Sequence, residues 1–336
     1  MGVEKHPFFL YYLLMLQIKL KTHPEAKNLL LTKFLWPNTL EHYKNDSNWE
    51  AVLGEKPENT INNFLHEGLI IEGKLFDQIN GNLTIFDLKN RLRNENLKLT
   101  GTKPELINRL LDKNSDLLAK EFAEMKMLIC SRKGANLANQ FKKELKDRLI
   151  MLEIDVLDLL KCKEFIYAIQ RICDYEINQV FPRGLNYETW HEGHIQHYQE
   201  SLIEIFIVKP KILKNIENSE LEILRPYAGM ILLFGKNRGS RVWLPRNFVL
   251  KSKMNVDSAA RMLIFYSNHK SQLRNFQNAG FSRVQILTCG DSCKECQKLD
   301  KKIFQIDGVI ELPFENCTHK YGCRCCYIYP IFTEKQ

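Results

Sequence analysis

Apolar residues in the first half of the chain recur mostly at helical spacing. Between residues 58 and 71, Ile61, Phe64 and Leu65 share one helical face. The same spacing continues from residue 115 to residue 180. Because a helix with one apolar face buries that face against a core, these stretches predict an almost entirely helical first half.

Three cysteines, Cys130, Cys162 and Cys173, are scattered through the predicted helices of residues 115–180. None of them has a His or Cys neighbour at the spacing that metal ligands use. We therefore interpret these three cysteines as small apolar residues of the helical core and not as reactive groups.

The pattern changes in the second half, where shorter apolar runs alternate with turn residues. The runs at 230–234 and 241–244 flank a glycine-containing segment and predict a β-hairpin. The tip of this hairpin would carry three basic side chains, Lys236, Arg238 and Arg241.

A helix is predicted over residues 256–280, with Asp257 or Ser258 as its N-cap. A short buried strand at 284–287 follows it, and a second strand is expected at 301–306. The C-terminal end of the chain therefore combines one helix with a small sheet.

Two short helices joined by a tight turn are predicted within residues 83–113. Thr84 and Asp87 form a capping-box pattern at the start of the first helix, and Thr102 can cap the second. Gly101 frees the backbone just before the second helix, and Pro104 suits its first turn. The amide groups at such a helix N-terminus can accept a phosphate.

This segment resembles the SAP motif, a helix–turn–helix unit of DNA- and chromatin-associated proteins. Asn96 stands where the motif usually has Gly, and Asn tolerates the left-handed conformation better than most residues. The residues that carry the resemblance are Leu88, Leu92, Leu97, Gly101, Lys103, Leu106, Arg109 and Leu110. The resemblance implies DNA as a partner, with contacts from Lys89, Arg91, Lys98, Thr100, Gly101, Lys103 and Arg109.

Positive charge is concentrated in one part of the chain. The formal net charge is +8, and the stretch from Lys236 to Arg283 holds ten Lys or Arg and a single acid, Asp257. A basic block of this kind favours a polyanionic partner, nucleic acid first, although a solvated basic face would have the same composition.

The apolar run at residues 7–20 is too short to cross a bilayer, and Gln17 and Lys19 interrupt it. No small-residue cleavage site follows it, so it does not match a signal peptide. We predict a first helix packed against the protein or a partner, no membrane partner, and a soluble protein in the cytoplasm.

The strongest chemical signal is a cysteine cluster at residues 289–326. Cysteines at this density with Cys-x2-Cys spacing indicate a metal site in a reducing compartment, because secreted disulfide scaffolds spread their cysteines through a small domain. The cluster contains Cys289, Cys293, Cys296, Cys317, His319, Cys323, Cys325 and Cys326.

We predict a structural zinc ion held by four of these side chains. Cys293, Cys296 and Cys323 are the first three ligands, and the fourth is left open among Cys317, Cys325 and His319. Four such ligands leave no coordination position for a reacting water, so the site would hold the fold and not hydrolyse a substrate.

The order of elements around the cluster resembles the C-terminal region of the phage Mu F-like minor head, or head-morphogenesis, family. This chain departs from that family in an inserted segment at 317–322, in the extra Cys289 and Cys326, and in Lys301 where Gly is usual. The matching residues are Cys293, Cys296, Leu299, Asp300, Leu312, Pro313, His319, Cys323, Arg324 and Cys325.

These observations predict a multidomain fold that is mainly α, with a small zinc-stapled α+β domain at the C-terminus. We expect an N-terminal helical region (1–80), a SAP-like unit (81–114), a helical domain (115–182), a mixed helix and hairpin region (183–255) and a zinc-binding domain (256–336).

The predicted function is non-enzymatic DNA binding with a structural zinc site. A phage-derived head-morphogenesis-like structural protein is the first alternative, because of the C-terminal resemblance. A metal-dependent nuclease is the second, although we find no paired carboxylates near a Lys, no nucleophile elbow and no phosphate-binding glycine loop in the sequence.

Overall fold

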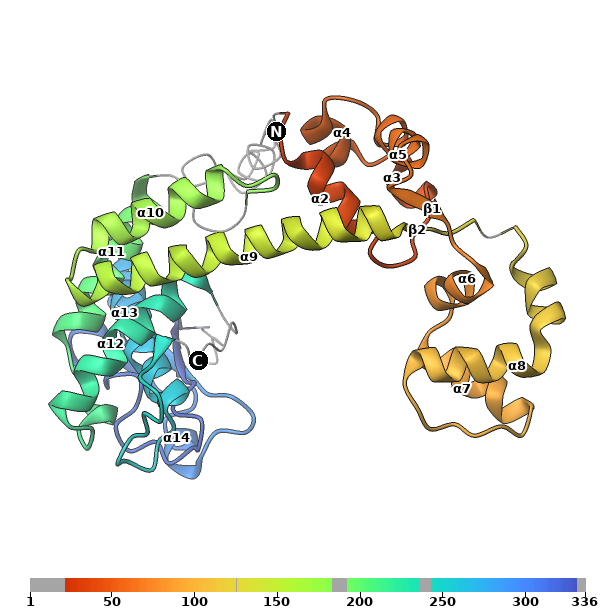
Figure 1. Cartoon of the computed structure of the whole chain (residues 1–336). Helices are drawn as coiled ribbons and strands as arrows, with labels where there is room; N and C mark the ends of the chain where they lie inside the picture. The colour runs from red at the N-terminus through yellow and green to blue at the C-terminus, as the bar shows by residue number, and fades with distance from the viewer. Residues whose placement is uncertain (1–21, 125, 183–191, 236–242, 331–336) are drawn as a thin grey trace, which may run out of the picture. The chain divides into compact units, whose positions relative to one another are not determined.

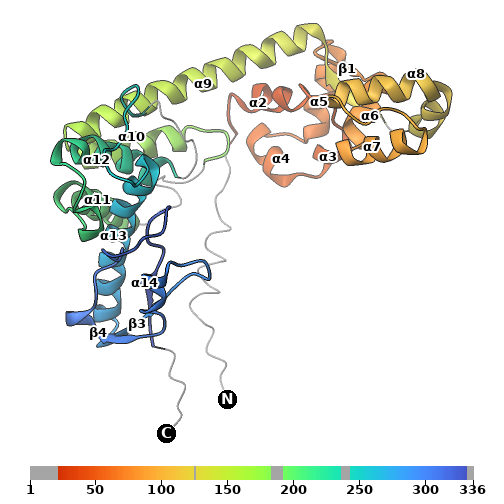
Figure 2. The same cartoon turned by 90° about the horizontal axis from the view of Figure 1, so that it is seen from below.

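The computed structural model describes residues 22–124, 126–182, 192–235 and 243–330 (Figures 1 and 2). The chain forms two compact units, Met1–Leu149 and Ile150–Gln336. The predicted first helix at 7–20 and the predicted hairpin tip lie outside the described residues.

Within its described residues the chain is mainly helical, with two small antiparallel sheets, one of them at the C-terminal end. This confirms the predicted fold class of a mainly α protein with a small α+β region. None of the described helices has the length and apolar character needed to span a bilayer.

The described part of the first unit starts with four short helices, α2 (Ala26–Lys33), α3 (Glu41–Lys44), α4 (Ser47–Leu53) and α5 (Pro57–His66). They bury Leu30, Phe34, Ile61 and Phe64 in a common apolar interior. The predicted helix at 58–71 is therefore confirmed as α5, which ends before Gly68.

Two paired strands enclose the next part of the chain. Strand β1 (Ile70–Glu72) pairs antiparallel with β2 (Leu128–Cys130), so that Ile70 lies opposite Cys130. The helices α6 (Leu75–Asn82), α7 (Ile85–Asn94) and α8 (Lys103–Phe122) lie between these strands in the sequence. Pairing of β1 with β2 therefore brings together the two ends of the segment that contains α6, α7 and α8.

Helices α6, α7 and α8 share a hydrophobic core of their own. Its buried members are Ile79, Leu88, Leu92, Leu106, Ile107, Leu110, Leu118 and Phe122. The core extends beyond the expected limits of 81 and 114 at both ends, because α6 contributes Ile79 and the last turns of α8 contribute Leu118 and Phe122.

The expectation that residues 115–180 are all helical is wrong at β2 (Leu128–Cys130). Helices α9 (Arg132–Lys161) and α10 (Phe165–Ile177) follow, as predicted. Cys173 is buried in α10, but Cys162 is exposed, which corrects its expected place in the core.

The second unit packs α11 (Glu192–Ile207), α12 (Asn218–Phe234) and α13 (Val256–Asn278) against one another, with a 3-10 turn, η1 (Lys211–Leu213), between α11 and α12. The predicted strand at 230–234 is wrong, because these residues are the end of α12. Tyr227, Ala228 and Met230 lie within four consecutive positions and are all buried. Helix α12 is therefore covered on several sides. A helix buried in this way has a short apolar run that resembles a strand.

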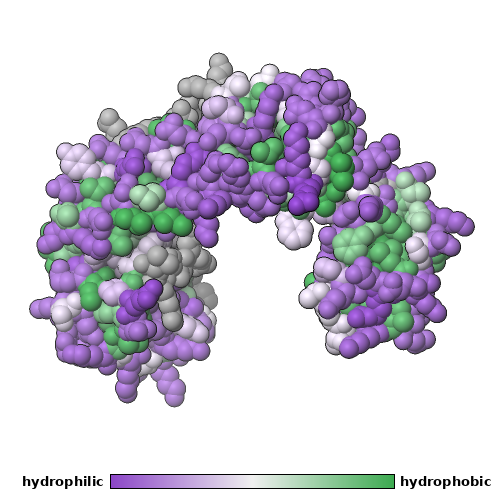
Figure 3. Space-filling model, in the orientation of Figure 1, coloured by the Kyte–Doolittle hydropathy of each residue, from purple (hydrophilic) through white to green (hydrophobic). Residues whose placement is uncertain are grey.

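Helix α13 confirms the helix expected at 256–280, but its N-cap is Asn255, whose side chain accepts a hydrogen bond from the Ser258 amide at 2.8 Å. The helix continues without a break to Asn278. On the face drawn in Figure 3 hydrophilic residues predominate, as expected for the outer sides of amphipathic helices.

A three-stranded antiparallel sheet completes the chain in the spatial order β4–β3–β5. Its strands are β3 (Arg283–Leu287), β4 (Ile303–Gln305) and β5 (Cys326–Ile328), and the short elements α14 (Lys294–Gln297) and η3 (Ile306–Gly308) follow β3 and β4. The strands predicted at 284–287 and 301–306 are present as β3 and β4, and β5 was not predicted.

Candidate metal centre and nucleic-acid interface

The sheet brings together two cysteine-bearing segments that are distant in sequence. The first cysteine turn (289–296) follows β3, and the second cysteine loop (317–325) precedes β5. Because β3 and β5 are antiparallel, with Leu287 opposite Cys326, the residues after β3 meet the residues before β5.

Five thiols gather where the two segments meet. The Sγ atoms of Cys293 and Cys317 are 3.8 Å apart, and those of Cys296 and Cys323 are 4.0 Å apart. Two groups of three, Cys293–Cys296–Cys317 and Cys296–Cys323–Cys325, each have all their Sγ atoms within 4.8 Å of one another. Cys296 belongs to both groups, so the five thiols form one continuous cluster that can hold a metal ion.

The geometry fits a tetrahedral thiolate site. Metal–sulfur bonds of about 2.3 Å place neighbouring sulfurs of a zinc tetrahedron about 3.8 Å apart. The distances of 3.8 Å and 4.0 Å match this edge length. A disulfide is not present at any cysteine within the described part of the chain.

Local hydrogen bonds prepare Cys293 to be a thiolate. Burial by itself raises the pKa of this thiol, but backbone amide groups of Cys296 and Thr318 point at the sulfur and lower its pKa to about 6. The Thr318 amide lies 3.4 Å from Sγ. Cys293 is the N-cap of α14, which explains why free amides surround it.

The neighbouring thiols behave differently without an ion. Burial, followed by the nearby Cys323, raises the pKa of Cys296. Contact with Cys323 and burial raise the pKa of Cys317. Several sulfurs within contact distance cannot all be ionised in an apolar setting unless a cation compensates their charge, so the cluster favours a bound metal cation.

The second cysteine loop packs against Met262 of helix α13. The Cys323 amide donates to Sδ of Met262 at 3.3 Å. Gly322 has a φ of +81°, and a Cβ at this position would lie 2.6 Å from Cε of Met262. The glycine before Cys323 therefore allows both the turn and its close approach to α13.

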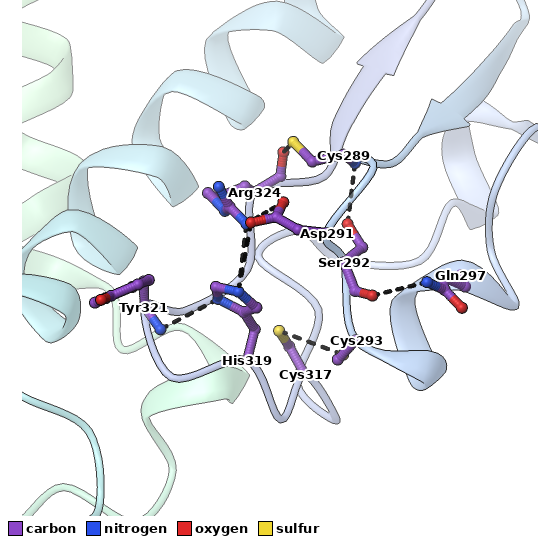
Figure 4. Close-up of polar contacts among 9 residues, drawn as sticks. All are labelled: Cys289, Asp291, Ser292, Cys293, Gln297, Cys317, His319, Tyr321 and Arg324. Atoms are coloured by element: carbon purple, nitrogen blue, oxygen red, sulfur yellow. Dashed lines mark hydrogen bonds and ion pairs between the residues drawn. The ribbon is translucent and has the colours of Figure 1, made fainter.

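His319 is occupied by other partners and does not join the thiol groups. Its Nδ1 accepts a hydrogen bond from the Tyr321 amide at 3.2 Å, and its Nε2 lies 3.3 Å from Nη2 of Arg324. Arg324 also pairs with Asp291 at 2.5 Å, which lowers the pKa of the Asp291 carboxyl. Figure 4 shows Arg324, Asp291 and His319 pointing toward one another, so this network ties the first cysteine turn to the second cysteine loop.

The two remaining cysteines lie outside the thiol groups. Sγ of Cys289 is 3.5 Å from the Arg324 carbonyl oxygen, and Cys326 is part of β5. Of the eight candidate side chains, the structure thus brings together Cys293, Cys296, Cys317, Cys323 and Cys325, and it leaves Cys289, His319 and Cys326 apart. The ion pair between Asp291 and Arg324 was not predicted from the sequence. An acidic residue two positions before Cys293 could have indicated a charged partner near the cluster.

The predicted helix–turn–helix is present as α7, a turn and α8. The Asp87 carboxylate accepts from the Thr84 amide at 2.9 Å, and the Asp87 amide donates to Oγ1 of Thr84 at 3.2 Å, which confirms the capping box. Asn96 has a φ of +55° and Gly101 a φ of +135°. Both positions where the turn needs unusual backbone angles therefore carry residues that tolerate them.

Three of the residues proposed to contact DNA have partners inside the protein. Arg91 forms a two-pronged ion pair with Glu121 at 2.6 and 2.7 Å. Nζ of Lys103 donates to the Asn80 carbonyl, and Nη1 of Arg109 donates to the carbonyls of Lys98 and Thr100. These side chains brace the unit. Lys98, Thr100 and Gly101 are exposed on the turn, and Lys89 is half-buried on α7.

The N-terminus of α8 already holds an acidic group. The amide and hydroxyl of Thr102 both donate to the Glu105 carboxylate, at 2.6 and 3.0 Å. These bonds lower the pKa of Glu105. A phosphate approaching the amides here would meet a carboxylate, so the exposed turn is a better place for a phosphate than the helix N-terminus.

The basic block divides into paired and unpaired side chains. Lys251 pairs with Glu217 at 2.8 Å, and Arg274 pairs with Glu200 at 3.1 Å. Among the described residues, Arg246, Lys253 and Arg261 form no ion pair. Several cations near the start of α13 are therefore available to an anionic partner.

The chain matches no family model, no curated protein and no solved structure. The two resemblances of the sequence thus stay predictions, supported only by the geometry of their own residues.

Proposed function

We propose that the chain is a non-enzymatic DNA-binding protein whose C-terminal domain is held together by a structural zinc ion. The observation that carries DNA binding is the exposed turn between α7 and α8. Asn96, Gly101 and Arg109 hold its shape, and Lys98 and Thr100 project from it. Contacts of this kind go to the phosphate backbone, so binding should be salt-dependent and largely independent of DNA sequence.

Zinc is the metal that this donor set favours. Soft thiolate ligands in a tetrahedral arrangement select zinc or iron–sulfur clusters, and a closed site of four thiolates serves structure. The set best supported by the distances is Cys293, Cys296, Cys317 and Cys323, with Cys325 as a neighbour. Thiolate ligands persist where thiols stay reduced, which fits an intracellular protein.

The zinc assignment is tested by measuring the metal content of purified full-length variants. Cys293→Ser and Cys317→Ser should each lose the ion and destabilise the second unit, because metal binding is coupled to folding. Cys289→Ser and Cys326→Ser are matched controls that should retain one zinc per chain. Equal zinc loss in Cys326→Ser and Cys317→Ser would contradict the proposed ligand set.

The DNA assignment is tested by fluorescence anisotropy with a labelled duplex at low and moderate salt. Lys98→Glu should weaken duplex binding at least fivefold. Lys120→Glu, an exposed lysine near the other end of α8, changes the net charge equally and should have little effect. Absence of duplex binding by the zinc-loaded wild-type chain at low salt would exclude this function.

A structural role like that of head-morphogenesis proteins is a second candidate, favoured by one observation. Lys301 stands where the resembling family has Gly, and it has a φ of +60°. Asp300 beside it accepts hydrogen bonds from the amide and hydroxyl of Thr288, both at 2.9 Å. The turn thus has the backbone shape that a Gly would adopt. Large assemblies in size-exclusion chromatography, without DNA binding, would favour this candidate.

A further inference from the structure

A cavity of about 1240 Å³ lies beside the second cysteine loop. Its walls are the segment 244–255, the first turns of α13 and the part of the second cysteine loop that carries Tyr321 and Arg324. All of these parts belong to the second unit. The helix–turn–helix of α7 and α8 lies in the other unit and contributes nothing to this cavity.

The lining is strongly basic. Arg246, Lys253, Arg261 and Arg324 line the cavity, against a single acid, Asp257. Asp257 is engaged by the Tyr227 hydroxyl, which donates to its Oδ1 at 2.5 Å. Arg324 is paired with Asp291, whereas the other three cations form no ion pair among the described residues. Unpaired cations around one concavity focus positive potential and attract an anion.

Ser252 lies in the wall of the cavity. Its hydroxyl is buried and has no hydrogen-bond partner within the described residues. A buried hydroxyl without a partner costs free energy. A rotation of this side chain toward the cavity would let the hydroxyl donate to a bound phosphate oxygen.

Aromatic side chains complete the lining. Tyr321 is 54% exposed, and Phe265 is half-buried on α13. Both line the cavity, so a planar base entering it has aromatic faces on which to stack. The combination of cations and aromatic rings is the one that single-stranded nucleic-acid sites use, because a flexible strand exposes both its phosphates and its bases.

The volume favours a strand over one small ligand. Small-molecule sites occupy about 300–1,000 Å³. The cavity exceeds this range, so it has room for more than one nucleotide. A rigid duplex keeps its bases stacked inside and could use only the cations.

We propose that this cavity binds phosphate-bearing single-stranded nucleic acid, with Arg246, Lys253 and Arg261 on the phosphates and Tyr321 under a base. The proposal deepens the nucleic-acid function proposed above, since it assigns the unpaired strand to a second site. The exposed turn between α7 and α8 remains the site for duplex.

The test is anisotropy of the zinc-loaded full-length chain with labelled dT12 and, separately, with a labelled duplex. Arg261→Glu and Lys253→Glu should each raise the Kd for dT12 at least tenfold. Lys302→Glu is the matched control, an exposed lysine outside the cavity with the same change of charge, and should stay within twofold. Lys253 is exposed on a loop, so its variant keeps the test valid if Arg261→Glu fails to fold.

Stacking is tested with Tyr321→Ala, which should weaken dT12 binding at least fivefold and leave duplex binding within twofold. Tyr329 is similarly exposed, at 58%, and lies outside the cavity, so Tyr329→Ala is its control. Thymidine monophosphate added as a competitor distinguishes a mononucleotide from a strand. Unlabelled dT12 and thymidine monophosphate are each added to displace labelled dT12, and their concentrations are compared per phosphate group. The strand proposal requires displacement by dT12 at a far lower phosphate concentration, and equal values would overturn it.

Two results would separate the proposals. Duplex binding that Lys98→Glu weakens, without dT12 binding by the wild-type chain, would overturn the cavity proposal and leave the DNA-binding function standing. Equal effects of Arg261→Glu and Lys302→Glu on dT12 would overturn it as well, because the attraction would then be general. If the wild-type chain binds neither dT12 nor the duplex, both proposals are overturned.

Discussion

Single residues decide how the second cysteine loop is built. Gly322 combines a φ of +81° with close contact to Met262, while Gly280 has a nearly equal φ of +83° and open space around it. The two glycines therefore separate the cost of backbone conformation from the cost of contact. An L-residue in the left-handed region costs about 1–2 kcal/mol.

We predict that Gly322→Ala destabilises the second unit more than Gly280→Ala. Both substitutions have the backbone cost. Only Gly322→Ala forces the Met262 side chain to move, which weakens the hydrogen bond from the Cys323 amide to Sδ of Met262. Thermal unfolding followed by circular dichroism, together with the zinc content of each variant, measures the difference. Equal destabilisation would mean that Met262 adjusts freely and does not support the loop.

The exposed turn between α7 and α8 gives a second residue-scale prediction, for Arg109. Its guanidinium donates to the carbonyls of Lys98 and Thr100, so Arg109→Ala should loosen the turn and weaken duplex binding. Hydrogen exchange at residues 97–101 should increase in this variant. In Lys98→Glu, duplex binding should fall without that increase.

At the scale of elements, α7 and α8 depend on their capping boxes. Hydrogen bonds from Thr84 lower the pKa of Asp87, and hydrogen bonds from Thr102 lower that of Glu105. A carboxyl whose pKa is lower in the folded state stabilises the fold above its unfolded pKa, near 4. That stabilisation disappears as the pH falls through the lowered folded values.

We therefore predict that acidification below pH of about 4 loosens α7 and α8, since the two caps become protonated there. Amide exchange of α7 and α8, measured at several pH values, follows this loss. The double variant Asp87→Asn, Glu105→Gln should be less stable at neutral pH and should respond less to pH in that range. An unchanged pH response in the variant would assign the effect to other carboxyls.

At the scale of the whole molecule, the two units should respond differently to metal removal. The first unit holds one cysteine, Cys130, whose pKa is raised by burial to about 11, and no part of the cluster. The cluster lies entirely in the second unit and links the segment after β3 to the segment before β5.

We predict that a strong zinc chelator exposes residues 283–328 to hydrogen exchange and leaves α6, α7 and α8 protected. The physical reason is that four thiols freed from a cation repel or protonate, whereas the core of α6–α8 contains only apolar side chains. Mass spectrometry of exchanged peptides resolves the two regions. Equal loss of protection in both would mean that the zinc supports more than its own domain.

Local signals predicted much of this molecule because short-range rules govern them. The Thr84–Asp87 capping box joins residues only three positions apart, and the backbone angles of Asn96 and Gly101 are local properties. Their roles could therefore be recognised from the sequence without knowledge of the fold. The strand at 230–234 was mispredicted because its apolar run is buried on several sides as the end of α12, and burial from several sides depends on α11 and α13.

By itself the sequence determined the mainly helical class, the helix–turn–helix with its caps, and the presence of a cysteine cluster near the C-terminal end, since composition and local spacing are sufficient for these. Only the tertiary structure decided which side chains meet. Antiparallel pairing of β3 with β5 selected five thiols and separated Cys289, His319 and Cys326 from them. The packing of α6, α7 and α8 turned Arg91, Lys103 and Arg109 toward partners inside the protein. The fold of the second unit left Arg246, Lys253 and Arg261 around a cavity, because the partners of a charged side chain depend on neighbours that are distant in sequence.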